Sequence, residues 1–331
     1  MNLRTTFTVN ASRSKISYDT PVLLLGSCFA EEIGSRMTDG KMNVMVNPTG
    51  IVYNPHSVGN TIDMVLDNRI FTESDIYSHE SKHISFSHST DFTSESISKA
   101  LDRINSSTSD ANHFLKKARF LIISFGTARI YRFKERNIIV SNCHKLPHSF
   151  FSREMLTVEG IVSDWSAILD RLHSFNNDLH VIFTISPVRH WKDGAHGNQV
   201  SKSILVLAVE KLLEHQIVEG YFPAYELIMD DLRDYRFYAD DMLHPSHAAV
   251  EYIWKIFSEC YFETGTMELW KEVQGIAKTR NHRLLSDSPT DKKEFASQML
   301  EKITAIEKEH PDINFARERS YFLKMNSIFS K

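Results

Sequence analysis

Three short apolar runs, each ended by a glycine or a proline, constrain the fold of this chain more than any other feature. They are Pro21–Gly26, Phe120–Gly126 and His180–Pro187. Unbroken apolar runs of this length are typical of strands buried on both faces of a parallel sheet. Segments with the apolar spacing of amphipathic helices stand between them. This alternation predicts an α/β sandwich with a mainly parallel sheet.

Apolar spacing also gives coarse positions for the other elements. Proline and glycine mark residues 41–60 as an ordered loop, and the polar stretch 72–112 is predicted to form surface loops with one helix. A final core helix is predicted to start near Pro245. The remaining predicted strands are a hairpin from residues 130–133 and 138–140, and a weaker strand at 220–224. The other predicted helices cover residues 29–37, 57–66, 96–104, 158–175 and 201–215.

The end of the chain differs in composition from the rest. From about Ser286 it is rich in lysine and glutamate, and its apolar residues recur at the spacing of one amphipathic helix. These residues are Phe295, Met299, Ile303 and Ile306. We therefore expect a main domain over residues 1–265 and a helical C-terminal extension over residues 266–331 that packs on it.

Composition excludes several classes of protein. The 38 Lys and Arg residues nearly balance the 42 Asp and Glu residues, so the net charge of −4 draws the chain neither to nucleic acid nor to a membrane surface. The N-terminus lacks the apolar segment of a secretory signal, and no run approaches the length of a spanning helix. Cys28, Cys143 and Cys260 lack the spacing of a disulfide framework or a zinc knuckle. We expect a cytoplasmic protein with no nucleic-acid or membrane partner.

Reactive residue types occur where the predicted strands end. Ser27 stands between the first apolar run and a helix, whose first amides can stabilise an oxyanion. The same position also suits a serine that only caps the helix. Asp241 and His244 stand just before the final core helix. His244 can act as a general base for Ser27, and Asp241 can orient its imidazole.

Six short motifs together resemble those of one family. Gly26-Ser-Cys-Phe-Ala30 is the signature after which the GSCFA family is named, and it resembles the first block of the SGNH (GDSL-like) hydrolases. The later motifs follow in the family's order: Asn47–Pro55, Phe125–Ala128, Asn142–Lys145, Ser186–His190 and Asp241–Pro245. The resemblance covers about residues 20–260.

This resemblance implies a three-layer α/β/α fold with Ser27 as nucleophile, His244 as base and Asp241 as its partner. It implies a carboxylic-ester hydrolase or acyltransferase that works through an acyl-serine intermediate. The implied substrate is a small-molecule or glycan ester, such as an O-acetyl ester. No cofactor or metal is needed for this chemistry.

The chain departs from the SGNH pattern in its third block. There Gly126 is followed by Thr127, where SGNH hydrolases supply an oxyanion-hole asparagine. We therefore predict that the hole is completed by the backbone amides of Ser27 and Gly50 and by the side-chain amide of Asn54.

Three residues that follow the second and third apolar runs, Thr127, Arg189 and His190, are expected to line the substrate pocket, where Arg189 can bind an anion. Cys28 is an alternative nucleophile because helix N-termini favour thiolates, although its side chain is expected to point into helix packing. The histidines of His144–His148, or Asp241, His244 and His247 together, would instead suit a metal-dependent hydrolase. A third alternative is a non-catalytic module that binds a glycan or a partner through a degenerate site.

Overall fold

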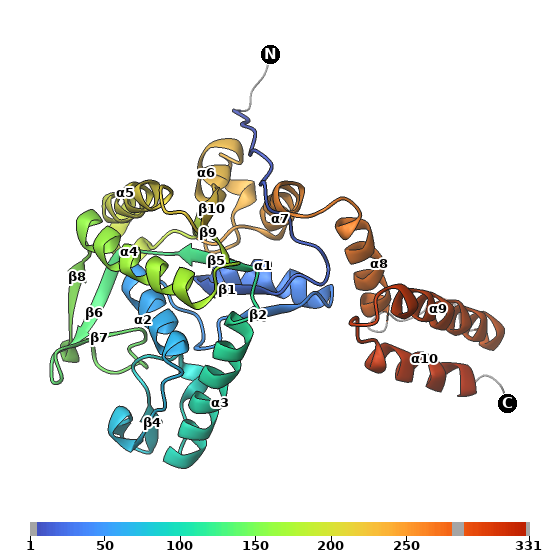
Figure 1. Ribbon diagram of the computed structural model, residues 1–331, viewed down its shortest axis with the longest axis horizontal. Coiled ribbons are helices and arrows are strands. Elements are labelled where there is room, and N and C mark those ends of the chain that lie inside the picture. Colours follow the sequence, from blue (N-terminus) through green and yellow to red (C-terminus); the bar gives the residue numbers. More distant parts are fainter. Residues whose placement is uncertain (1–4, 280–287, 329–331) are drawn as a thin grey trace. The chain divides into compact units, whose positions relative to one another are not determined.

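The computed structural model describes residues 5–279 and 288–328. At its centre lies a five-stranded sheet whose strands all run parallel, in the order β10-β9-β5-β1-β2 (Figure 1). The strands are β1 (Val22–Gly26), β2 (Val44–Val46), β5 (Phe120–Phe125), β9 (His180–Ile185) and β10 (Val218–Phe222). The three apolar runs of the sequence form the three central strands, which confirms the α/β prediction.

The register of the central strands brings their carboxyl ends to one edge of the sheet. Gly26 of β1 pairs with Ser124 of β5, and Ser124 pairs with Thr184 of β9. The segments that follow β1, β5 and β9 therefore start side by side, although they are far apart in the sequence. Edges of this kind are where open α/β sheets place their functional groups.

Helices cover both faces of the sheet, so the main body has the predicted three layers. Alternate residues of β1, such as Leu23 and Leu25, belong to an apolar cluster with residues of α2, α3, α4 and α5. On the other face, Phe222 of β10 stacks on Phe29 of α1 and meets Phe257 of α7 edge to face. The helices are α1 (Cys28–Asp39), α2 (Pro55–Leu66), α3 (Ile97–Leu115), α4 (Val158–Phe175), α5 (Gly194–Leu212), the short α6 (Ala224–Glu226) and α7 (His247–Tyr261).

A small antiparallel sheet projects from the same edge. Its strands, in the order β7-β6-β8, are β6 (Arg129–Phe133), β7 (Ile138–Val140) and β8 (Phe151–Met155). The predicted hairpin is therefore confirmed, and β8 is an addition. Residues 72–112 are not only surface loops as predicted. They contain β3 (Tyr77–His79), β4 (Lys82–Ile84) and a buried Phe86, because Ile84 and Phe86 pack against the small sheet.

Other element boundaries differ from the predictions for identifiable reasons. The helix predicted over 96–104 extends to Leu115 as α3, because the buried polar residues Thr108 and Asn112 interrupt the apolar pattern. Asn112 donates from Nδ2 to the carbonyl oxygen of Val65 at 2.8 Å. The predicted loop 41–60 contains β2, and α5 begins at Gly194 rather than near residue 201.

The chain divides into two compact units. The first comprises Met1–Lys15, Thr20–Gly34 and Val44–Tyr261, and the second comprises Ile16–Asp19, Ser35–Asn43 and Phe262–Lys331. The second unit holds α8 (Thr266–Thr279), α9 (Pro289–Glu309) and α10 (Ala316–Ile328), where one tail helix was predicted. The predicted start near Ser286 lies outside the described residues.

Residues from the N-terminal part of the chain belong to this second unit through specific contacts. Trp270 of α8 donates from Nε1 to the carbonyl oxygen of Arg36 at 2.8 Å. Lys41 forms an ion pair with Glu318 of α10 at 3.1 Å. Sequence continuity alone cannot reveal such contacts, and for that reason the predicted boundary at residue 265 assigned these segments to the main domain.

Among the helices in the described part of the chain, none combines the length and the apolar character needed to cross a lipid bilayer.

Candidate active site

Ser27 is held at the strand edge by bonds to a neighbouring strand. Its amide donates to the carbonyl oxygen of Ser124 at 3.0 Å, and the two hydroxyls lie 2.7 Å apart. Ser27 Oγ also accepts from the amide of Phe29 at 3.2 Å, as an N-cap does. Only 1 % of Ser27 is exposed. Ser27 therefore both caps the helix and lies at the strand edge, and its hydroxyl is held by hydrogen bonds.

The backbone around Ser27 requires a glycine before it. Gly26 has φ +125°, and a Cβ at this position would lie 2.1 Å from the carbonyl oxygen of Ser124. Both the conformation and the space therefore exclude a side chain. The amide of Gly26 donates to Oδ1 of Asn47 at 2.8 Å, so the motif that contains Asn47 supports the turn that carries Ser27.

Asp241 and His244 form a compact pair in the loop before α7. Asp241 Oδ2 lies 2.5 Å from His244 Nδ1, and Asp241 Oδ1 accepts from the amides of Leu243 and His244, each at 2.9 Å. These amide bonds, followed by the imidazole bond, lower the pKa of Asp241 to about 2. An ionised Asp241 accepts the Nδ1 proton of His244, which leaves Nε2 as the nitrogen that can take up another proton. The two side chains are 46 % and 49 % exposed.

Ser27 and His244 line the same cavity, of about 450 Å³. The loop that follows β9 is joined to the loop of His244 by a bond from the amide of Arg189 to the carbonyl oxygen of Leu243 at 3.3 Å. Ser27 Oγ is bonded to Ser124 rather than to His244 in this structure. The structure thus brings the predicted nucleophile and base to one cavity, while the hydroxyl still faces its neighbour in the sheet.

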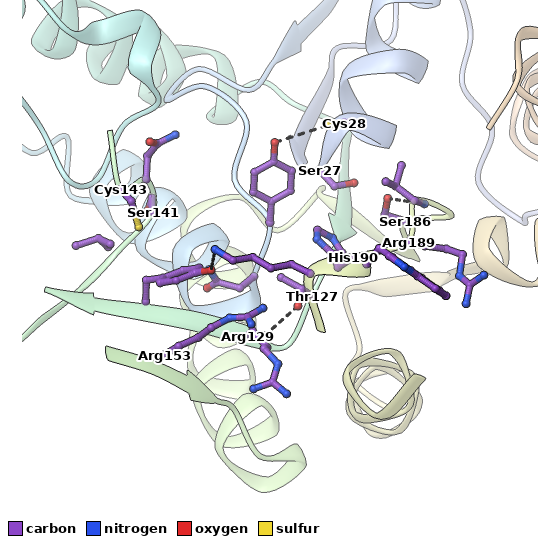
Figure 2. Close-up of a pocket in the computed structure, with 18 of the residues that line it drawn as sticks. Ser27, Cys28, Thr127, Arg129, Ser141, Cys143, Arg153, Ser186, Arg189 and His190 are labelled. Carbon is purple, nitrogen blue, oxygen red and sulfur yellow. Dashed lines mark hydrogen bonds between the residues drawn. The ribbon is translucent and has the colours of Figure 1, made fainter. Parts of the chain in front are cut away.

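Cys28 lines this cavity together with Ser27, as Figure 2 shows. Its Sγ lies 3.7 Å from the hydroxyl of Tyr53. The expectation that Cys28 points into helix packing is therefore wrong, because the first turn of α1 presents both side chains to the cavity. Burial, followed by the nearby Cys28, raises the pKa of the Tyr53 phenol, so that phenol stays protonated at neutral pH.

The predicted oxyanion-hole donors differ in their availability. The Gly50 amide donates to the carbonyl oxygen of Asn47 at 2.7 Å and Gly50 does not line the cavity, so its prediction is wrong. The Ser27 amide is likewise used by the Ser124 carbonyl oxygen. Asn54 lines the cavity and caps α2, where its Oδ1 accepts from the amide of Ser57 at 2.8 Å. Because Oδ1 serves the cap, the Nδ2 group of Asn54 is left as a donor.

Thr127, Arg189 and His190 all line the cavity, where the sequence had placed them. The ring of His190 meets Tyr53 edge to face, with 5.9 Å between ring centroids. Burial, followed by the charge of Lys202, lowers the pKa of His190 to about 4. His190 is therefore neutral at physiological pH. Thr127 is turned toward α5, with its hydroxyl 3.0 Å from that of Ser201.

Lys202 of α5 supports the segments that follow β5 and β9, and the sequence analysis assigned it no role. It is 1 % exposed, and Nζ donates to the carbonyl oxygens of Gly126 at 2.8 Å and of Ser186 at 2.6 Å. These carbonyls follow β5 and β9, so one ammonium group joins two of the segments that form the site. Burial lowers the pKa of Lys202 to about 7.

The small antiparallel sheet contributes a wall that sequence reasoning missed. Arg129 and Tyr131 of β6, Arg153 of β8 and Lys192 of the loop after β9 line the cavity. Arg129 directly follows the Phe125–Ala128 motif, which is a signal that could have drawn attention to it. Lys192 lies two residues after the Ser186–His190 motif, whereas Tyr131 and Arg153 cannot be assigned to the site without the strand register.

The histidines singled out as metal ligands have other partners. His144 Nε2 lies 2.9 Å from the carbonyl oxygen of Ser85, and His247 lies on α7 with Nε2 3.6 Å from Glu251. Within residues 5–279 and 288–328, no three His, Cys, Asp or Glu side chains converge as metal ligands would.

The chain was compared with family models, with curated proteins and with solved structures. A model of the GSCFA family matches residues 21–257. A search of curated proteins gave no match. Among solved structures, a crystal structure of a carbohydrate esterase family 3 protein from Talaromyces cellulolyticus is similar over 76 % of this chain and 99 % of that chain, with 9 % identity and a TM-score of 0.35.

Proposed function

The chain belongs to the GSCFA family, and on that premise we propose that it is a serine hydrolase that cleaves a carboxylic ester, with Ser27, His244 and Asp241 as its triad. One observation carries the proposal. A serine at the carboxyl edge of a parallel sheet lines the same cavity as a histidine whose other ring nitrogen is paired with an ionised aspartate. Together these are the three parts that nucleophilic acyl transfer needs.

The first half of the proposed reaction forms an acyl-serine. Ser27 Oγ exchanges its bond with Ser124 for one with His244 Nε2, which takes the proton as Oγ attacks the ester carbonyl carbon. Asn54 Nδ2 donates to the oxygen that becomes negative. The bond between the acyl carbon and the alcohol oxygen then breaks, and His244 returns the proton to the departing alcohol. Asp241 stays ionised and stabilises the imidazolium.

The second half regenerates the enzyme. A water molecule attacks the acyl carbon while His244 takes one of its protons, and this proton then returns to Ser27 Oγ as the acyl bond breaks. The products are a carboxylic acid and a free serine. If an alcohol takes the place of water, the same steps give an acyltransferase.

Hydrolysis of p-nitrophenyl acetate by the purified protein tests this proposal. We expect Ser27→Ala and His244→Ala to lower kcat at least about 1000-fold, because members of a triad act as a unit. Ser203→Ala serves as the matched control, since Ser203 is exposed on α5 and outside the cavity. Retained activity in both triad variants would refute the assignment.

Labelling by a fluorophosphonate probe separates the alternatives. Modification of Ser27, found by mass spectrometry and lost in His244→Ala, supports a serine enzyme. Modification of Cys28 by an electrophilic acyl donor, with full activity in Ser27→Ala, would make the thiol the nucleophile. Absence of labelling and of esterase activity in a folded protein would favour the non-catalytic binding module.

A further inference from the structure

The cavity wall contributed by the small antiparallel sheet, on the side away from Ser27, is rich in positive charge. Arg129, Arg153, Arg189 and Lys192 all line the cavity, and among the described residues no Asp or Glu side chain lines it. In the view of Figure 2, Arg129 and Arg153 lie on the other side of Thr127 from Ser27. The chain as a whole is slightly acidic, with a net charge of −4, so this concentration of cations is local.

Strand register explains why these cations share one face. Arg153 of β8 is the direct cross-strand partner of Tyr131 of β6, and Arg129 lies two residues before Tyr131. Side chains two apart in a strand, and side chains directly opposite on the next strand, point to the same face of a sheet. The small sheet therefore presents both guanidinium groups beside one tyrosine ring.

The single carboxylate behind this wall, that of Asp193, does not balance the positive charges of the wall. Asp193 has a side chain only 3 % exposed, lies 3.1 Å from Arg129 Nε and accepts from the two terminal nitrogens, Nη1 and Nη2, of the Arg153 guanidinium. One carboxylate thus serves two guanidinium groups. It holds them in place and leaves an excess of positive charge toward the cavity.

Lys192 adds a further positive charge, and no carboxylate in the described part of the chain forms an ion pair with it. Its Nζ donates to the hydroxyl of Tyr131 at 3.1 Å and lies 5.4 Å from the centre of that ring. The Arg153 guanidinium lies 5.5 Å from the same ring. Tyr131 thus holds these two cations in place through its hydroxyl and its ring, and it fixes their positions for an incoming anion.

We propose that Arg129, Arg153 and Lys192 form a subsite for a carboxylate on the alcohol half of the ester, so that the substrate is the acyl ester of an acidic, sugar-sized alcohol. The inference rests on the proposed function, because Ser27 defines the end of the cavity where the acyl group lies. Guanidinium groups match the geometry of carboxylates. A cavity of about 450 Å³ suits a ligand of that size.

The test compares an acidic substrate with a neutral one. The two substrates are matched in their acetyl groups and differ only at C6. They are the 2,3,4-triacetate of methyl glucuronoside, which carries a carboxylate at C6, and the 2,3,4-triacetate of methyl glucoside, which carries a neutral hydroxymethyl group there. Release of acetate gives kcat/KM for each. We expect the wild-type ratio of acidic to neutral substrate to be about tenfold or more, because charge-assisted hydrogen bonds are the strong ones.

Variants then assign the preference to the subsite. Lys192→Gln and Arg153→Gln should each lower the ratio several-fold, and added salt should lower the wild-type ratio because it screens exposed charge. Lys211→Gln on the exposed side of α5 is the matched control and should keep the ratio. A wild-type ratio near one, or a ratio that neither variant changes, overturns the subsite.

A binding measurement separates this inference from the proposed function. Ligand-observed NMR with Ser27→Ala compares the unacylated methyl glucuronoside with methyl glucoside, and needs no catalysis. Selective binding of the acidic sugar that Lys192→Gln weakens supports the subsite even if no ester is cleaved. Ser27-dependent hydrolysis of both esters at equal rates, with no selective binding, leaves the hydrolase standing and refutes the subsite.

Discussion

The two sides of the cavity that carry the proposed triad are built in opposite ways. The strand-edge wall, residues 26–28, 124–127 and 186, is buried and held by long-range bonds, such as those of Ser27 with Ser124 and of Lys202 with two carbonyls. The base loop, residues 239–246, is half-exposed and held by bonds among its own residues, such as that from the Ala239 amide to the His244 carbonyl oxygen at 2.8 Å. The wall therefore depends on the whole fold, whereas the loop depends on a few neighbours.

This difference predicts which substitutions lower stability and activity together and which lower activity alone. Changes in the strand-edge wall should lower both together, because the same bonds hold the sheet and the nucleophile. Changes in the base loop should lower activity and leave the free energy of unfolding nearly unchanged. Four substitutions test this contrast, in decreasing order of the effect that each should have.

Gly26→Ala should have the largest effect. Its Cβ would lie 2.1 Å from the Ser124 carbonyl oxygen at φ +125°, so we expect the free energy of unfolding to fall by about 3 kcal/mol or more. Urea unfolding followed by circular dichroism measures this. The control is Gly275→Ala in α8, where a Cβ meets nothing within 4 Å and should stabilise the helix by about 0.5–1 kcal/mol. Similar values for the two variants would contradict the rigid wall.

Asp241→Asn should separate activity from stability. The asparagine side chain cannot supply the charge that stabilises the His244 imidazolium, so we expect kcat for p-nitrophenyl acetate to fall about 100-fold or more. The loop is exposed, and the unfolding midpoint should therefore move little. A large loss of stability at full activity would reverse the contrast between loop and wall.

Lys202→Met should lower stability and activity together. The substitution leaves the buried carbonyl oxygens of Gly126 and Ser186 without their donor, at a cost of about 2 kcal/mol. It also loosens two segments that line the cavity, so kcat should fall. Lys211→Met, the same substitution on the exposed side of α5, is the control. Equal unfolding midpoints for the two variants would show that the bonds of Lys202 do not support the wall.

His190 should give the smallest effect, visible as a dependence on pH. Burial lowers its pKa to about 4, so between about pH 4 and 6.5 the unfolded chain binds more protons than the folded chain. Stability from this group is therefore lost as pH falls through that window. Between pH 7 and 5.5, we expect the free energy of unfolding of His190→Gln to fall by about 1 kcal/mol less than that of wild type. His247→Gln on the exposed surface of α7 is the control, and its stability should depend on pH as that of wild type does. The same dependence on pH in His190→Gln would contradict the prediction.

The sequence predicted the strand-edge wall and the base loop better than the cations that line the cavity. Ser27 and His244 could be found because their positions follow from apolar runs and from the motif order, and both depend only on local pattern. Arg129 directly follows one motif and Lys192 lies two residues after another, but their convergence with Arg153 depends on the register of β6 and β8, which no run of residues encodes. Gly50 failed for a related reason, since its amide is used by Asn47 in a turn that spacing does not reveal.

The same distinction holds for the fold. The parallel sheet follows from continuous apolar runs, whose burial on both faces leaves a strong signal. The helix α3 was predicted too short because buried Thr108 and Asn112 satisfy their polar groups inside the structure. The assignment of residues 35–43 to the second unit rests on contacts such as that of Trp270 with Arg36, which join distant segments.

The strand order has a consequence for the order of events during synthesis. Strand β1 is made early, but it pairs with β2 and with β5, and Ser27 is 97 positions from the serine that anchors it. A ribosome-bound chain that ends before β5 therefore carries Ser27 at the end of a strand whose edge toward β5 is unpaired. Because pairing between distant segments is slow, we expect chain elongation to expose β1 for longer than any strand made after it. Chaperone capture of nascent chains should accordingly fall once β5 and β9 have emerged.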